Sequence, residues 1–356
     1  MRREEFVIAD ITKMRHFANA ALIDAGLDAD VAALVAEVQL EASIRGQPTH
    51  NVGDIPLYAE HIRSGYVNAY PIMQTITESD SHLKLDADCG PGQWAACIAM
   101  KRAIEIARRG GMAIVTVQNS RHYGASGYYA SMAADAGMIG MCTTNAGATV
   151  APWGSKEKML GNNPLGFACP TGGAHPFMLD IAMSVVAAGK VGLRLAQGKE
   201  VPLGWLLDKN GRPTTDPTAL GKGGSLHPIA DHKGYGLASI MEILSGVLSG
   251  SKFGADHTRA NSSKPGQTED IGHFFFVINP AIFMPIEDFT GRMDKLVDDL
   301  TGADLIDQSG RVVIPGSFEY EARDRNVANG TIPIIRETYE KILKFSGDRG
   351  IAMDWD

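Results

Sequence analysis

The spacing of apolar residues predicts helices at both ends of the chain. Between residues 10 and 45, apolar side chains such as Met14, Phe17 and Leu22 recur every three or four positions, which is the spacing of one helix face. Asp28 stands in the middle of this pattern, where an N-cap is expected, so the segment predicts a helical hairpin. The same spacing predicts further helices over residues 56–62, 93–108, 128–135, 235–247, 287–300 and 333–345.

The middle of the chain has short β-branched apolar runs instead. The clearest is Gly111–Gln118, a pattern typical of a buried strand. Two polar segments, residues 208–217 and 251–270, are predicted to be loops, and the second is long enough to be a candidate lid. Strands that alternate with helices indicate an α/β fold. The other predicted strands cover residues 74–78, 82–86, 139–145, 165–170, 177–181 and 273–278.

The composition narrows the class of protein and its partners. The chain has 356 residues, 44% of them hydrophobic, and a formal net charge of -8. An acidic protein without a basic stripe is not expected to bind nucleic acid, and no run of about 18 apolar residues predicts a membrane span. The charged N-terminus lacks the apolar core of a secretion signal. The four cysteines have neither zinc-ligand nor disulfide spacing, so we expect a cytoplasmic protein with reduced thiols and no metal site.

Three residues are candidates for catalysis because of where they stand. His122 follows the strand predicted at 111–118, at the carboxyl end where open α/β sheets bind ligands. His50 lies in a polar turn, and Asp180 ends another predicted strand. A histidine can move a proton to or from a substrate oxygen near neutral pH, and a carboxylate can orient its ring. Each also has an alternative interpretation as a structural residue that hydrogen-bonds its neighbours.

The glycine fingerprint of an ordinary dinucleotide-binding site is absent. The nearest sequence, Gly234–Ser239, lacks the third glycine and follows a loop-like segment, so a regular Rossmann site is not expected. The start of this helix, with Lys233 beside it, can still receive an anion. Alternatively, its glycines only permit close helix packing. The nucleophile elbow G-x-S-x-G is also absent, which gives a hydrolase little support.

Ordered motifs nevertheless run through nearly the whole chain. They are Thr49-His50-Asn51 with Pro56 and Tyr58, Asn119–Gly124, Thr144-Asn145, Ala151–Gly154, Gly161–Pro164, Asp180–Ser184, Gly189-Lys190, Pro213–Asp216, His232–Gly236 and Pro315-Gly316. In this order they resemble the malate/L-lactate dehydrogenase family of the second type. That family also contains L-sulfolactate and ureidoglycolate dehydrogenases, diketogulonate reductase and a reductase of piperideine-2-carboxylate.

The resemblance implies a non-Rossmann nicotinamide-binding fold, in which helices flank a mixed sheet and follow an N-terminal helical segment. It also implies a homodimer whose subunits share each active site. We expect a helical, dimer and substrate region at residues 1–110, a cofactor-binding and catalytic domain at 111–285, and a C-terminal helical segment at 286–356 that returns to the first domain. By matching position, His50 and His122 handle the proton. The positions that match cofactor contacts are Thr144, Asn163, Asp180, Ile181, Ala182, Met183, Ser184, His232, Lys233, Gly316, Ser317, Phe318 and Glu319.

One departure from the family pattern concerns the substrate. The family commonly has an arginine four residues after the first histidine, where this chain has Asp54, and an aspartate repels the carboxylate that an arginine binds. Arg45, Arg121 and Thr144 are the candidates for substrate binding in its place, or the substrate has a hydroxyl or amine instead of that carboxylate.

The leading hypothesis is an NAD(P)-dependent oxidoreductase that interconverts a 2-hydroxy acid and a 2-keto acid by hydride transfer, with NAD slightly favoured over NADP. Its partner is then a small-molecule substrate. Two alternatives stay open. One is the reduction of a cyclic imine such as piperideine-2-carboxylate, and the other is a non-catalytic ligand-binding homologue.

Overall fold

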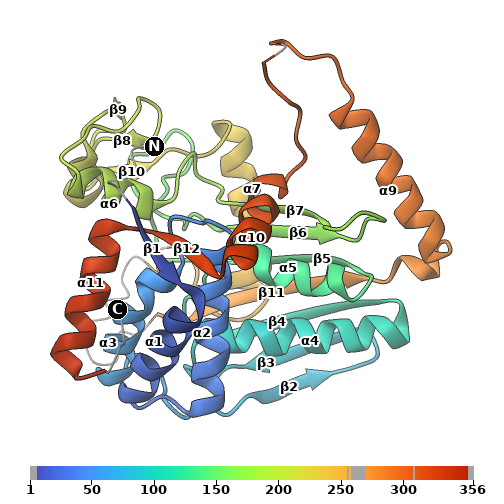
Figure 1. Cartoon of the computed structure of the whole chain (residues 1–356), viewed down its shortest axis with the longest axis horizontal. Helices are drawn as coiled ribbons and strands as arrows, with labels where there is room; N and C mark the ends of the chain where they lie inside the picture. Colours follow the sequence, from blue (N-terminus) through green and yellow to red (C-terminus); the bar gives the residue numbers. More distant parts are fainter. Residues whose placement is uncertain (1–5, 255, 258–268, 308, 352–356) are drawn as a thin grey trace.

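The main sheet runs through the centre of the molecule (Figure 1). The computed structural model describes residues 6–254, 256–257, 269–307 and 309–351. Only β3 and β4 pair in parallel, and the other neighbours are antiparallel, so the predicted mixed sheet is confirmed. Its seven strands, in spatial order, are β2 (Gln74–Glu78), β3 (His82–Asp86), β4 (Met112–Ser120), β11 (Ile271–Ile278), β5 (Ile139–Thr144), β6 (Leu165–Cys169) and β7 (Phe177–Ile181).

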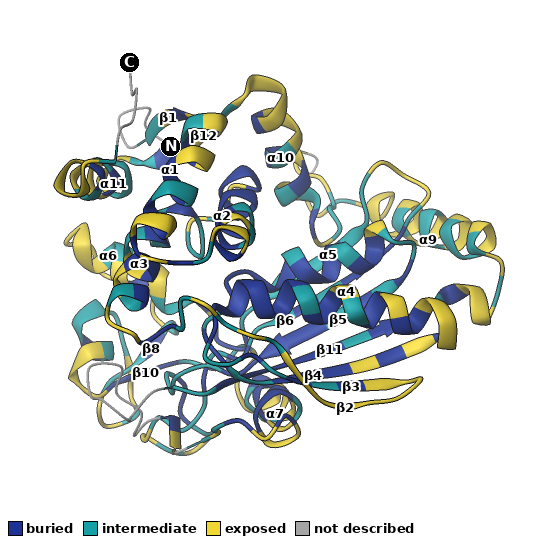
Figure 2. Ribbon diagram, turned by 90° about the horizontal axis from the view of Figure 1, so that it is seen from below, coloured by how far each residue is buried: buried dark blue, intermediate teal, exposed yellow. Residues whose placement is uncertain are grey.

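Helices cover both faces of this sheet (Figure 2). On one face, α4 (Gly92–Gly110) packs on β4, and α5 (Ser126–Asp135) packs on β5 and β6. On the other lies α7 (His232–Glu242), which continues as a π-helical turn over Ile243–Val247. The central strand β11 is buried at most of its positions, because helices cover both of its faces.

The predicted helical hairpin is confirmed at the N-terminal end. Helix α1 (Ile11–Asp24) packs against α2 (Ala29–Ile44), and α3 (Ile55–Arg63) follows a short 3-10 turn at Val52–Asp54. The side chain of Asp28 accepts hydrogen bonds from the amides of the first turn of α2, which is the N-cap that the sequence predicts.

The two ends of the described chain meet in a separate strand pair. Strand β1 (Phe6–Asp10) pairs antiparallel with β12 (Thr331–Ile335). The helix predicted from residue 333 is therefore wrong at its start, since helix α11 spans Arg336–Arg349. The apolar run of Thr331–Ile335 is β-branched and contains a proline, and it becomes a strand because a segment more than 300 residues away supplies the partner.

Further elements complete the molecule around the sheet. Helix α9 (Ile286–Thr301) is confirmed as a surface helix with no buried position and stands away from the body (Figure 1). Helix α10 (Ser317–Asn329), which the sequence pattern missed, packs on α2. A small lobe combines α6 (Ala188–Ala196), a 3-10 turn at Pro217–Lys222, and the short strands β8 (Leu206–Leu207), β9 (Pro213–Thr214) and β10 (Ser225–Leu226).

Of the candidate lid at 251–270, residues 255 and 258–268 lie outside the described part. Within the described part, no helix combines the length and the hydropathy that crossing a bilayer requires.

Candidate active site

His122 is placed by the end of strand β4 and by the start of helix α4. The strand ends at Ser120, and His122 follows two residues later, at the carboxyl end that the sequence predicted. Gly92 lets α4 approach this segment closely, because a Cβ atom on it would lie 2.0 Å from the Arg121 carbonyl oxygen. The close approach of helix to loop is therefore possible only with glycine at this position.

His50 comes from the turn between α2 and α3 and lies directly against His122. The two rings stack with their centroids 5.2 Å apart and their planes at 18°. His50 has a φ of 61°, a left-handed conformation that is strained for a residue with a side chain and is most often seen at functional sites. Its Nδ1 lies 3.1 Å from the Thr49 hydroxyl. The structure thus brings together the two histidines that the sequence singled out.

The environment of His122 keeps its imidazole neutral. Burial lowers its pKa to about 3, with further lowering from His50, His273 and His61. Its Nδ1 lies 2.8 Å from the hydroxyl of Tyr58 on α3, and burial raises the pKa of that phenol well above its usual value. An uncharged imidazole with a neutral hydroxyl partner can donate or accept a hydrogen bond at its other nitrogen.

The environment of His50 differs because a carboxylate lies near it. Burial lowers the pKa of His50, and Asp54 opposes this by raising it. Burial in turn raises the pKa of Asp54, while the imidazole and the backbone amide of His50 lower it. A nearby carboxylate stabilises a protonated imidazole. Of the two rings, His50 is therefore the one that can more readily hold a positive charge.

A polar cleft opens beside the stacked rings. It has a volume of about 1120 Å³, part of which is open to solvent, and it reaches the usual size of a pocket for a large ligand. Both histidines line it, together with the first residues of α5, the end of β7 and the α6 region. The predicted cofactor positions that line it are Thr144, Asp180, Ile181, Ala182, Ser184 and Glu319.

Asp180 does not orient an imidazole, contrary to one sequence-based hypothesis. Its Oδ2 accepts hydrogen bonds from the Gly127 amide at 2.9 Å and from the Gln47 side chain at 3.3 Å. Strand β7 lies beside β6 under the start of α5, so the carboxylate faces that helix terminus. Burial raises the pKa of Asp180, and its bond from Gly127 partly offsets this. Asp180 instead links the end of β7 to the start of α5 through Gly127 and to Gln47, which also lines the cleft.

The start of α6 offers positive potential to the cleft. Ala187 is the N-cap of α6, and no side chain caps this helix. Ala187 and Lys190 both line the cleft, so an uncapped helix N-terminus and an ammonium group face the same space. Such an arrangement suits a phosphate group. The cleft therefore fits a dinucleotide both in volume and in the chemistry of its walls.

Several predicted site residues lie outside the cleft. Two predicted cofactor residues support its wall from below: Asn163 is fully buried and its amide donates to Glu242 and to the Ala238 carbonyl, and Met183 is buried in a small apolar cluster. The others that do not line the cleft are His232, Lys233, Gly316, Ser317 and Phe318.

The two arginines proposed for the substrate carboxylate are also absent from the cleft lining. Arg45 is buried and paired with Glu41 at 2.9 Å, and it donates to Ser131. Arg121 lines a second cavity, behind His122. Thr144, the third candidate, does line the cleft, with its hydroxyl 2.7 Å from His273 Nδ1.

Sequence reasoning missed some residues that the structure places in the site. Tyr58, Gln47, Ser126 and Lys190 contact a histidine or line the cleft. Asp54 and Tyr58 are four residues apart, and this helical spacing after the His50 turn was the available signal for Tyr58. Gln47 carried no comparable signal, because its role depends on Asp180, which is distant in sequence.

Relatives of this chain are dehydrogenases over nearly its whole length. The family model described as malate/L-lactate dehydrogenase matches residues 9–343. Malate dehydrogenase of Pyrococcus abyssi is 36% identical over 98% of this chain and 96% of that protein. Ureidoglycolate dehydrogenase (NAD(+)) of Escherichia coli is 34% identical over 90% of this chain and 91% of that protein. (2R)-3-sulfolactate dehydrogenase (NADP(+)) of Chromohalobacter salexigens is 35% identical over 74% of this chain and 78% of that protein.

Solved structures have the same fold. The crystal structure of malate dehydrogenase from Entamoeba histolytica has a TM-score of 0.93 and 30% identity, and it covers 98% of this chain and 99% of that one. The Δ1-piperideine-2-carboxylate reductase of Pseudomonas syringae has a TM-score of 0.85 and 27% identity, and it covers 95% of this chain and 99% of that one.

Proposed function

Because this chain belongs to the malate/L-lactate dehydrogenase family, we propose that it oxidises a 2-hydroxy acid to the 2-keto acid at His50 and His122. The sequence-based expectations of the family, of an NAD(P)-dependent dehydrogenase and of the 2-hydroxy acid class are confirmed. The observation that carries the proposal for the site is the stacking of two imidazoles, 5.2 Å apart, at the wall of a cleft of dinucleotide size.

The two histidines have different roles at the substrate oxygen. His50 takes the hydroxyl proton, since Asp54 stabilises the imidazolium that forms. His122 stays neutral and donates a hydrogen bond to the same oxygen from Nε2, while Nδ1 accepts from Tyr58. A bound nicotinamide would supply the acceptor for the hydride that leaves the carbon. The strained turn and the stacking hold both rings in place for this step.

The polar cleft would hold the cofactor in this proposal. Ser126 and Asp180 would contact its nicotinamide end, and Lys190 with the start of α6 would bind its phosphates. We retain NAD as slightly favoured over NADP. Relatives are named for each of the two.

We further propose a homodimer with shared active sites. In the described part of the chain, two helices carry apolar side chains that the subunit leaves uncovered. Leu237, Ile240 and Ile243 are about half exposed along α7 and its π-helical turn, and Leu296 and Leu300 are about half exposed on α9. Covering such faces is a usual reason for association. Light scattering should give twice the mass of one chain, and the mass of one chain would contradict the dimer.

The cytoplasm is the proposed compartment. Cys97, Cys142 and Cys169 are buried and free, and Cys89 is free and partly exposed. Unpaired thiols are typical of a reducing environment.

The test of the proposed function is a screen of dinucleotide reduction. L- and D-2-hydroxy acids are each offered with NAD or NADP, and the formation of the reduced cofactor is followed by absorbance. We expect turnover of at least one 2-hydroxy acid and loss of that turnover in His50→Ala. Wild-type protein that binds NADH but oxidises no hydroxy acid would contradict the proposal.

The similarity to a piperideine-2-carboxylate reductase keeps cyclic imine reduction as the second candidate. Reduction of that imine by NADPH or NADH, without turnover of any hydroxy acid, would favour it. A failure to quench or transfer fluorescence from either reduced dinucleotide would favour the non-catalytic homologue.

A further inference from the structure

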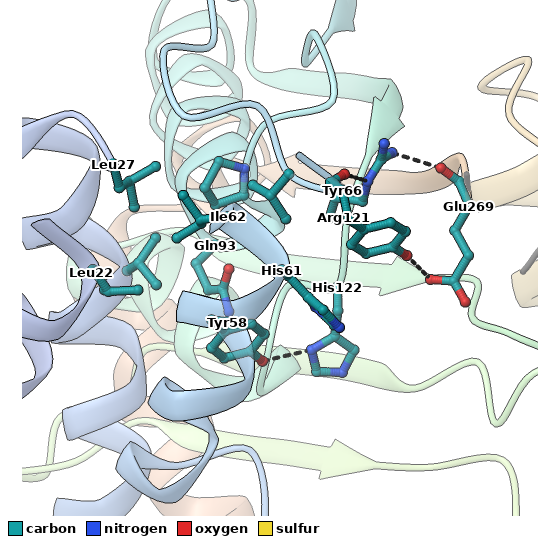
Figure 3. A pocket seen from close by; sticks show the side chains of 13 residues that line it. Leu22, Leu27, Tyr58, His61, Ile62, Tyr66, Gln93, Arg121, His122 and Glu269 are labelled. Atoms are coloured by element: carbon teal, nitrogen blue, oxygen red, sulfur yellow. Dashed lines mark hydrogen bonds between the residues drawn. The ribbon is translucent and has the colours of Figure 1, made fainter. Parts of the chain in front are cut away.

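His122 also lines a second cavity. We call it the chamber, and it has a volume of about 420 Å³, part of which is open to solvent. Within the described part of the chain, His122 is the one residue that lines both the cleft and the chamber. Figure 3 shows the imidazole at the chamber wall, held by the Tyr58 hydroxyl. A substrate whose oxygen touches this imidazole therefore lies against a residue of the chamber wall.

Most of the chamber wall is apolar. Its far end is formed by side chains of the N-terminal helices and the loops that follow them, all of them buried (Figure 3). Apolar surface of this kind stabilises an apolar group by removing it from water. The residues at this end are Leu22, Leu27, Val35, Ile62 and Val67.

The charged groups of the chamber are already paired with other groups. Arg121 is 3% exposed and donates to the carbonyls of Tyr66, Ser120 and Glu269. Its guanidinium also lies over the Tyr66 ring, 4.9 Å from the centroid. The Glu269 carboxylate accepts from the Tyr66 hydroxyl. One positive and one negative group face the same space, so a second acidic group on a ligand would meet repulsion as well as attraction.

Gln93 adds a polar group to the chamber wall. It is 1% exposed and lines the chamber. Its side chain lowers the pKa of the Tyr58 phenol through a hydrogen bond. The amide therefore supports the hydroxyl that holds His122.

We propose that the chamber receives the neutral apolar side chain of the 2-hydroxy acid substrate. The substrate class is then a 2-hydroxy acid with a branched aliphatic or phenyl side chain, and not one with a second acidic group. This inference rests on the proposed function, because it assumes that the oxygen of a hydroxy acid lies at His122.

The first experiment measures kcat/KM for a series of 2-hydroxy acids that differ only in the side chain. The series is L-lactate, 2-hydroxybutyrate, 2-hydroxyisocaproate, 3-phenyllactate and malate, each with the better dinucleotide. We expect kcat/KM to rise by about fourfold for each added methylene, with 2-hydroxyisocaproate above malate. Turnover that is highest for malate, or that does not rise with side-chain size, would overturn the inference.

The second experiment changes the far end of the chamber. Leu27→Phe should lower the ratio of kcat/KM for 2-hydroxyisocaproate over L-lactate by about tenfold, because the added atoms occupy the space of the side chain. Leu27→Ala should shift the preference toward 3-phenyllactate, because it enlarges the chamber. This variant is the test if Leu27→Phe does not fold. Leu34→Phe is the matched control, since Leu34 is a partly buried core residue that does not line the chamber. Its ratio should equal that of the wild type.

The outcomes separate the two proposals. A ratio that is unchanged in folded Leu27→Phe or Leu27→Ala, in an enzyme that oxidises hydroxy acids, overturns the chamber assignment alone. An absence of turnover with every hydroxy acid overturns the proposed function and the chamber assignment together. If the chamber held only water, these variants would change the pH dependence and leave the ratio of kcat/KM unchanged. This result would also overturn the assignment.

Discussion

The cleft and the chamber share one imidazole, that of His122, and have opposite chemistry. The cleft is large and polar, with Ser126, Asp180 and Lys190 in its wall, whereas the chamber is smaller and mostly apolar. Hydride transfer between two ligands requires both to meet at one point, and each needs its own surface. The comparison shows how one residue, His122, can face a charged cofactor on one side and an apolar substituent on the other.

The contrast also accounts for the charge state of the two histidines. His122 is enclosed between the two cavities with no carboxylate beside it, so burial holds its pKa at about 3. His50 lies toward the cleft, and Asp54 raises its pKa against the effect of burial. Two stacked imidazoles of the same chemical type therefore differ in their ability to take a proton, because only one of them has a nearby anion.

The largest expected effect comes from the residue shared by both cavities. His122→Ala should lower kcat by about 10²–10⁴-fold, because the substrate oxygen loses its hydrogen-bond donor, while the NADH affinity measured by fluorescence stays close to that of the wild type. His61→Ala is the comparison, since His61 lines the chamber but not the cleft. A loss of kcat in His61→Ala as large as in His122→Ala would break the distinction between the two sides.

A smaller effect is expected at the start of α6. Lys190→Ala should weaken dinucleotide binding by about tenfold, because a charged hydrogen bond to a phosphate is lost, and should change kcat little at saturating cofactor. Arg194→Ala is the control, as Arg194 lies one turn further along α6 and does not line the cleft. Titration of NADH fluorescence measures both. Equal affinities in the two variants would show that the phosphates do not bind at the start of α6.

The smallest effect concerns the electrostatic difference between the rings. Oxidation requires neutral His50 as the proton acceptor, so kcat/KM falls as the pH drops through its pKa. Asp54 raises that pKa, so Asp54→Asn should move the acid limb to lower pH and reduce the rate a few-fold, because the base is weaker. Profiles of kcat/KM against pH for Asp54→Asn and for Asp30→Asn, an exposed residue of α2, test this. An acid limb at the same pH in all three proteins would remove Asp54 from the mechanism.

Local patterns predicted most of the secondary structure. Gln74–Glu78 and His82–Asp86 form the two strands that the sequence predicted there. The α1–α2 hairpin formed with Asp28 as its cap. Prediction failed at β12, where a β-branched run allowed either a strand or the start of a helix and the deciding partner, β1, lies at the other end of the chain. Helix α10 has weak amphipathic character and few buried positions, so its apolar spacing was not visible.

The amino-acid sequence was sufficient for most of the elements, for the family and for His50 and His122 as a pair, because these depend on neighbouring residues and on ordered motifs. Folding in three dimensions was needed for the stacking of the two rings, for the bond between Asp180 and the start of α5, and for the chamber. The chamber draws Leu22, Gln93 and Glu269 from segments far apart in the chain. No local pattern encodes such a meeting, since the packing of whole helices against a sheet sets the distance between residues that are remote in sequence.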